Sequence, residues 1–179
     1  MLNKSLIALG TLGLVFAGNT SAVTFDDNLR IERQAKVIVT QDSQVTIRAF
    51  NINNRLPENG DELKDTKFFQ LGISSLDTNV KVSLAGGGET LIQGDGTVYS
   101  APRQEDGTTL IGIVENKYLG DIETDPLYLP NAANKTTGAS AVLLSGGTEH
   151  YLTINGADVS QNIMPGQYTF NFVAQAYTE

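Results

Sequence analysis

Residues 35–50 read AKVIVTQDSQVTIRAF, and apolar residues recur there at alternate positions: Val37, Val39, Val45 and Ile47. A period of two is typical of a β-strand with one buried face. The same alternation returns in residues 67–74 (KFFQLGIS) and 79–86 (NVKVSLAG). Shorter β-rich runs follow at residues 110–114, 141–144, 151–154 and 168–173.

Glycine, asparagine and proline separate these runs. Asn155-Gly156 follows an apolar run directly, which predicts a two-residue hairpin turn at that point. Residues 115–140 are less regular, and we expect a long loop region there with room for one strand. Short strands at this spacing, divided by turn residues, predict an all-β sandwich or barrel with little helix.

The composition excludes several classes of function. The chain has 179 residues, a formal net charge of −8, one histidine and no cysteine. An acidic chain lacks the basic face that nucleic-acid binding needs. Without cysteine there is no thiol chemistry, disulfide or cysteine-ligated zinc, and one histidine excludes motifs that need two. The fold must therefore be held by its core or by partner chains.

Residues 1–22 have the order of regions found in a secretory signal peptide. One positive charge (Lys4) precedes the apolar stretch 5–18, and the small residues Thr20 and Ala22 occupy the positions that a signal peptidase reads. We predict cleavage after Ala22 and export of residues 23–179; an uncleaved anchor is the alternative. No second apolar stretch approaches membrane length, so no membrane span is expected after cleavage.

Candidate catalytic residues are few. His150 is the sole possible imidazole base, no G-x-S-x-G motif accompanies it, and we expect it at the surface. Asp121 with Glu123 or Asp125 is a conceivable carboxylate pair for glycoside hydrolysis, but such a run is typical of a solvated loop. We therefore expect no catalytic residue and no enzyme activity.

Ligand and modification motifs are equally sparse. Residues 94–96 (GDG) and the acidic residues at 121–125 lack the spacing of an EF-hand calcium loop. Residues 86–88 (GGG) lack the lysine and the serine or threonine of a phosphate-binding loop. Asn134-Lys-Thr136 matches a glycosylation acceptor. We expect no cofactor and no metal site.

The two ends of the exported chain are the segments that indicate most about its function. Residues 23–44 (VTFDDNLRIERQAKVIVTQDSQ) contain neither glycine nor proline, and their apolar residues share one parity that Arg33 interrupts. These apolar residues are Leu29, Ile31, Ala35, Val37 and Val39. In the last segment, Phe170, Phe172, Ala174 and Ala176 share one face. Both ends could be ordinary sandwich strands; alternatively, the first is donated to another subunit and completes its sheet.

With these features the chain resembles a chaperone–usher fimbrial subunit, and most of all the major pilins of the alpha class, the colonisation factor antigen I type. The resemblance rests on a signal peptide, an N-terminal alternating strand, a cysteine-free β body and a final Pro165–Tyr168 turn and strand. The segments that resemble the family's strands are 37–50, 74–84 and 151–158. Residues 23–32 are extra before the matching strand.

The resemblance implies an incomplete immunoglobulin-like β-sandwich that a donor strand from a neighbouring subunit completes. It divides the chain into a signal peptide (1–22), a donor-strand extension (23–40) and a pilin sandwich domain (41–179). The donor strand would place Leu29, Ile31, Ala35, Val37 and Val39 in the neighbour. The C-terminal strand would line the acceptor groove or contact a chaperone, through Tyr168, Phe170, Phe172, Ala174 and Ala176.

The implied function is a structural one. The subunit would pass through the periplasm with a chaperone, cross an outer-membrane usher, and polymerise with its own kind into a surface fimbria that adheres to host cells through a receptor. Two alternatives stay open. One is a secreted carbohydrate-binding β-sandwich or adhesin, which needs exposed aromatic residues along a cleft; the other is a secreted hydrolase with a carboxylate pair.

Overall fold

The computed structural model describes residues 24–34, 45–53, 56 and 63–178. These ranges contain eleven strands and two short 3-10 helices, η2 and η3. The first strands are β1 (Thr24–Gln34), β2 (Val45–Phe50), β3 (Lys67–Ser75), β4 (Lys81–Gly86), β5 (Leu91–Ile92) and β6 (Thr97–Tyr99). They are followed by β7 (Ile111–Val114), η2 (Asn116–Asp121), β8 (Ile122–Glu123), η3 (Pro126–Tyr128), β9 (Ala141–Leu144), β10 (Glu149–Gly156) and β11 (Asn171–Thr178).

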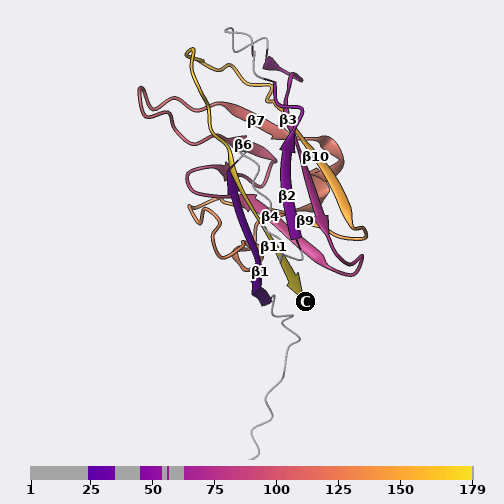
Figure 1. The fold of residues 1–179 in the computed structure, drawn as a ribbon. Helices are drawn as coiled ribbons and strands as arrows, with labels where there is room; N and C mark the ends of the chain where they lie inside the picture. Colours follow the sequence, from indigo (N-terminus) through magenta and orange to yellow (C-terminus); the bar gives the residue numbers. More distant parts are fainter. Residues whose placement is uncertain (1–23, 35–44, 54–55, 57–62, 179) are drawn as a thin grey trace, which may run out of the picture.

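The strands form two antiparallel sheets that pack face to face (Figure 1). The five-stranded sheet has the order β1-β11-β4-β9-β8, and the six-stranded sheet has the order β2-β3-β10-β7-β6-β5. Some neighbours are consecutive in the chain, such as β2 and β3, whereas others come from distant parts of it, such as β1 and β11 or β3 and β10. The predicted all-β sandwich is confirmed, and its completion by a strand from a neighbouring subunit stays a prediction.

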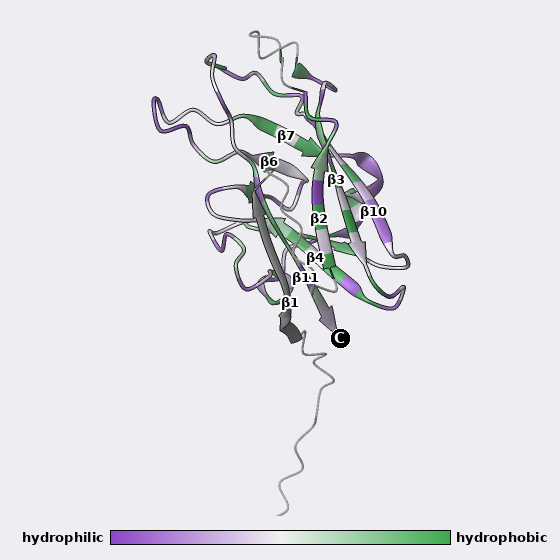
Figure 2. Ribbon diagram, in the orientation of Figure 1, coloured by the Kyte–Doolittle hydropathy of each residue, from purple (hydrophilic) through white to green (hydrophobic). Residues whose placement is uncertain are grey.

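The alternating residues of the sequence build the core between the sheets. Val45 and Ile47 of β2, and Leu71 and Ile73 of β3, are 0–5% exposed. They pack in one cluster with residues of β4, β7, β9, β10 and β11. Figure 2 shows hydrophobic residues along the strands and hydrophilic residues mainly in the connections. Val37 and Val39 lie outside the described residues.

Two predictions about connections have different outcomes. Residues 115–140 contain η2, η3 and the two-residue strand β8, as the irregular sequence indicated. The predicted hairpin turn at Asn155-Gly156 is wrong, because β10 continues through both residues, which pair with Ile113 and Gly112 of β7. A register shift against β3 occurs there, and a side chain on Gly156 would collide with the Leu63 carbonyl. This glycine marks a close backbone approach inside a strand, which is the other common use of glycine in sheets.

Candidate functional site

The N-terminal strand lies beside the C-terminal strand. β1 pairs antiparallel with β11 from Thr24 opposite Thr178 to Gln34 opposite Asn171. The register shifts between Phe25 and Arg30. β1 is the outermost strand of its sheet and also contacts β2, which is the edge strand of the other sheet. Figure 1 shows β1 and β11 running side by side in opposite directions, with the C-terminus near the start of β1.

β11 is buried on the face that points into the sandwich. Phe172, Ala174 and Ala176 are 0–4% exposed and belong to the core cluster. Phe170 precedes the strand and stacks on Phe172, with ring centroids 6.5 Å apart. The predicted shared face of these four residues is confirmed.

β11 is buried on its outer face as well. Val173, Gln175 and Tyr177 are 0–5% exposed. The loop around η3 covers them: the Asn131 N–H donates to Gln175 Oε1 at 3.0 Å, and the Tyr128 ring meets the Tyr177 ring edge-on at 5.7 Å. A strand that is buried on both faces keeps its backbone groups from water, so both of its edges must be paired by other strands.

β4 pairs one edge of β11 and β1 pairs the other. If β1 left, the N–H and C=O groups along that edge would lose their partners. Each buried backbone group left unpaired costs about 1–3 kcal/mol. An open edge next to apolar side chains is also a template for a strand from another chain. This edge of β11 therefore needs a partner strand, and the same backbone hydrogen bonds can form with a strand of its own chain or of another chain.

Arg103 fixes the segment that leads into β11. Its side chain is 9% exposed, and Nη1 donates to the carbonyl oxygens of Met164 and Pro165, each at 2.9 Å. The guanidinium lies 5.4 Å from the centre of the Tyr168 ring, and the Tyr168 hydroxyl donates to Met164 O at 2.8 Å. These contacts anchor the 164–168 turn, so β11 starts from a fixed position.

Asp106 completes this arrangement. Its Oδ2 lies 3.5 Å from Arg103 Nη1. Its Oδ1 accepts the Thr108 hydroxyl at 2.7 Å and the Thr108 N–H at 3.0 Å. These hydrogen bonds favour the charged carboxylate and hold the pKa of Asp106 below its ordinary value.

The predicted site residues fall into three groups. Leu29 and Ile31 belong to β1, where Ile31 is opposite Ala174 and Leu29 lies within the register shift. Ala35, Val37 and Val39 lie outside the described residues. Phe170, Phe172, Ala174 and Ala176 are in the core, and Tyr168 packs on Arg103. The roles of these residues in a donor strand and an acceptor groove stay predictions.

The acidic loop and the glycosylation motif are engaged in local structure. Glu123 Oε1 accepts the N–H groups of Thr124 and Asp125, and Asp125 Oδ1 caps η3 by accepting the Leu127 N–H at 2.9 Å. The Asn134 amide, which glycosylation would modify, donates instead to the Thr90 carbonyl at 3.1 Å.

His150 is half-buried, not on the open surface as expected, and its Nε2 has no hydrogen-bond partner among the described residues. Within the described ranges, no three histidine or acidic side chains gather as metal ligands would. None of the described residues forms a helix with the length and apolarity needed to cross a bilayer.

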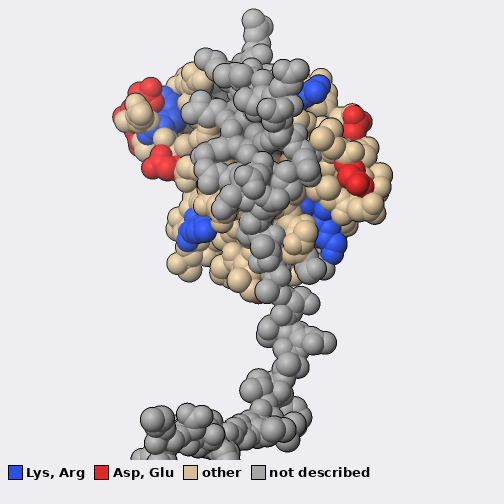
Figure 3. Space-filling model, turned by 60° about the horizontal axis from the view of Figure 1, so that its bottom comes forward, with Lys and Arg blue, Asp and Glu red and all other residues tan. Residues whose placement is uncertain are grey.

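Charged side chains of the described residues can be seen at the rim of the face in Figure 3. Figure 3 shows basic and acidic side chains in small separate groups around the rim of that face. Nonspecific binding to an anionic polymer requires a basic stripe or patch.

Comparison with known proteins gives distant structural likenesses. No family model and no curated relative matches the chain. The chain is similar to the Salmonella SafD adhesin at 13% sequence identity, covering 74% of this chain and 82% of that chain, with a TM-score of 0.47. It is similar to HdaB, the minor tip subunit of the E. coli Hda pilus, at 13% identity, covering 75% of this chain and 84% of that chain, with a TM-score of 0.49.

Proposed function

We propose that the chain is a structural subunit of a chaperone–usher fimbria, of the alpha-class major pilin type, that polymerises by exchanging β1 between copies. The observation that carries the proposal is the edge of β11. This strand is buried on both faces, and among the described residues β1 is the strand that pairs one of its edges. A second copy's β1 can make the same antiparallel pairing.

Exchange in one direction makes a fibre. Each copy would receive β1 from one neighbour and give its own to the next, which is a head-to-tail contact that does not close. The donor extension is residues 23–40, and its pocket residues are Leu29, Ile31, Ala35, Val37 and Val39. The fibre would stand on the cell surface and adhere to host cells.

The pairing within one chain explains why assembly needs partners. A strand on the same chain stays within reach of the edge that it pairs, which gives it a high effective concentration there. An isolated copy therefore fills its own edge before another copy arrives. A periplasmic chaperone that occupies the β11 edge would hold the subunit open, and an outer-membrane usher would bring the next copy's strand to it.

The absence of cysteine allows a direct test. Thr24 lies opposite Thr178 at the open end of the β1–β11 pair, so we would express a Thr24→Cys, Thr178→Cys double variant on the producing cell and oxidise it there. Exchange predicts a ladder of disulfide-linked oligomers on a non-reducing gel, which collapses on reduction.

The control is Thr178→Cys alone, which can give at most a dimer. If the double variant on the cell surface gives only an internally linked monomer, β1 stays in its own chain and the proposal is wrong. The same variant, purified in isolation, should give mainly that monomer, since the intramolecular strand is favoured there.

A further inference from the structure

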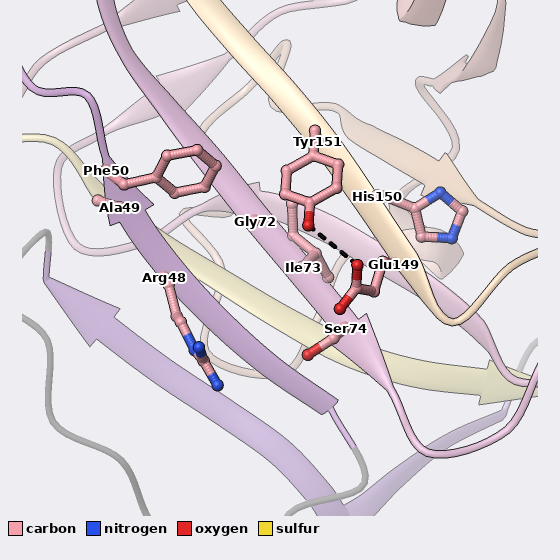
Figure 4. A pocket seen from close by; sticks show the side chains of 9 residues that line it. All are labelled: Arg48, Ala49, Phe50, Gly72, Ile73, Ser74, Glu149, His150 and Tyr151. Atoms are coloured by element: carbon pink, nitrogen blue, oxygen red, sulfur yellow. Dashed lines mark hydrogen bonds between the residues drawn. The ribbon is translucent and has the colours of Figure 1, made fainter.

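The outer faces of the two sheets differ in how they are covered. On the six-stranded sheet, the Phe50 and Tyr151 rings meet edge to face beside Gly72 (Figure 4), and Tyr151 stays 45% exposed. On the five-stranded sheet, residues 126–140 pass over β11, β4 and β9. We call these residues the strap; they run from the start of η3 to the residue before β9.

The strap holds two outward side chains of β11. The Asn131 N–H donates to Gln175 Oε1 at 3.0 Å, and the Tyr128 ring meets the Tyr177 ring edge-on with centroids 5.7 Å apart. On its other side, the Tyr177 ring lies 6.0 Å from the ammonium group of Lys81 on β4. Gln175 and Tyr177 are 0% and 5% exposed. The strap therefore fixes the half of β11 that ends near the C-terminus.

The strap is supported by strands that do not pair with β1. The Asn134 N–H donates to the Gly86 carbonyl at 2.7 Å, and the Ser83 hydroxyl donates to the Tyr128 carbonyl, so both bonds join the strap to β4. A second, small core lies between the strap and the sheet; its buried residues are Ala85, Leu129, Ala139 and Ala141. Since β4 pairs with β9 and β11, and β9 with β8, these supports stay in place when β1 leaves.

The backbone groups of β11 alternate between its two edges. The Asn171 N–H donates to Thr90 Oγ1 at 2.9 Å, and its carbonyl accepts the Gly87 N–H at 3.0 Å; both partners belong to the turn after β4. Successive residues of a strand direct these groups to opposite edges. Residues with outward side chains thus face β4, and residues with core side chains face β1. The first set is Val173, Gln175 and Tyr177, and the second is Phe172, Ala174 and Ala176.

We propose that the strap keeps β11 in its strand position from outside the sandwich, so that the edge facing β1 stays formed while β1 is away. Gln175 and Tyr177 are then positioning residues, which act on an incoming strand through the backbone that they hold straight. An edge that is already ordered accepts a strand with less loss of conformational freedom. The inference deepens the proposed function and rests on it, because a subunit that exchanges β1 needs an edge that survives without it.

Hydrogen exchange in the full chain, followed for single amides by NMR, tests the proposal. Parts of a fold open separately, each at its own free energy. The amides of Phe172 and Ala174, here the β1-edge amides, exchange when β1 alone opens. The amides of Val173 and Gln175, here the β4-edge amides, stay protected in that opening if the strap holds β11. We therefore expect the β4-edge amides to exchange at least about tenfold more slowly than the β1-edge amides.

Tyr128→Ala weakens the strap at one point. It removes the ring that meets Tyr177 and leaves the backbone carbonyl that Ser83 binds. Protection of the β4-edge amides should fall at least about tenfold, toward that of the β1-edge amides, because β11 can then leave together with β1. Exchange of the β1-edge amides should hardly change.

Two further variants sharpen this test. Tyr128→Phe keeps the ring and should restore the exchange pattern of the parent chain. Leu127→Ala is the matched control, because Leu127 is the preceding residue of η3 and is 56% exposed. If Tyr128→Ala does not fold, Gln175→Leu serves in its place, since it loses the bond from Asn131 and keeps a similar volume.

Three outcomes would overturn the proposal. They are equal exchange of the two sets of amides in the parent chain, an equal loss of protection throughout the sandwich in the strap variant, and the same loss in Leu127→Ala. The disulfide ladder described above reports whether β1 passes between copies. A ladder without the expected exchange pattern contradicts this inference alone, and the expected exchange pattern without a ladder contradicts the proposed function alone.

Discussion

Strands β10 and β11 both lie in the interior of their sheets, with a strand on each side, but they obtain these neighbours in different ways. β10 lies between β3 and β7, and all three belong to the continuous described segment 63–178. β11 lies between β4 and β1, and residues 35–44 separate β1 from the next strand. Both neighbours of β10 come from the segment 63–178, whereas one neighbour of β11 is β1, which lies outside that segment.

This difference divides the molecule into a part that must stay intact and a part that can be replaced. Losing a neighbour of β10 would dismantle the core, because β3 and β7 both contribute residues to it. Losing β1 would open one edge of β11 and leave β2–β11 connected as before. An added strand should therefore restore the stability that is lost when β1 is removed, but it should not restore the stability that is lost through a change in β10.

Deleting residues 24–34 should have the largest effect. Several backbone groups of β11 would lose their partners, at about 1–3 kcal/mol each, so we expect the shortened chain to aggregate or to melt far below the full chain. A synthetic peptide of residues 24–34 should restore the melting temperature. The same peptide with both Arg30→Pro and Ile31→Pro should not, because one of two successive residues in an antiparallel pair gives its N–H to the partner strand and proline has none. A shortened chain that melts like the full one would show that β11 needs no strand on that edge.

Leu152→Ala tests the other half of the comparison. Leu152 is on β10 and 0% exposed, and removing most of such a side chain costs about 2–5 kcal/mol through lost burial and a cavity. Urea unfolding should show this loss, and the 24–34 peptide should not reverse it. The matched control is Leu127→Ala, at a leucine that is 56% exposed and should change the urea midpoint little.

Gln175→Leu should have a smaller effect on β11 itself. Gln175 is fully buried and accepts the Asn131 N–H. Leucine has a similar volume but no acceptor, so the hydrogen bond from the Asn131 N–H would be lost, at a cost of about 1–3 kcal/mol. Thermal unfolding would measure the loss against Gln104→Leu, a change at an exposed glutamine. Equal stability of the two variants would mean that the loop around η3 does not depend on this bond.

Sequence alternation predicted the parts of the fold that have one buried face. Leu71 and Ile73 of β3, and Phe172 and Ala174 of β11, all lie in the core as their spacing indicated. Alternation could not show that β11 is also buried on its outer face, because Gln175 looks like a solvent-facing residue in a period-two pattern. Its partner, Asn131, is brought to it by a loop whose path no local pattern specifies.

The candidate site was predictable only in part for the same reason. The glycine-free, proline-free segment from Val23 indicated a long N-terminal strand, but not which strand it would pair with. Asn155-Gly156 indicated a turn because local preference favours one, and pairing with β7 overrides that preference. The Arg103 contacts join residues far apart in the chain, so only the folded structure brings them together.

The smallest expected effect concerns Asp106, next to the turn that leads into β11. Thr108 donates two hydrogen bonds to this carboxylate, and they hold its pKa in the folded chain below the ordinary value of 3.8. A lowered folded pKa means that the unfolded chain takes up the proton first. The stabilisation is therefore complete above about pH 3.8 and is lost as the pH falls through the lower folded value.

Asp106→Asn should consequently melt below the parent chain at pH 6, and the difference between the two should shrink as the pH falls from 4 to 2. Thr108→Val removes the hydroxyl donor, so the difference in melting temperature between this variant and the parent should show part of the same dependence on pH. When Thr108→Val is added to Asp106→Asn, the further change in melting temperature should hardly depend on pH. Melting temperatures of the four chains across that range would measure the effect. A difference that stays constant from pH 6 to pH 2 would mean that Asp106 acts through its shape and not through its charge. In that case the turn before β11 would depend on Arg103 and Tyr168, whose contacts with residues 164–165 do not involve the carboxylate.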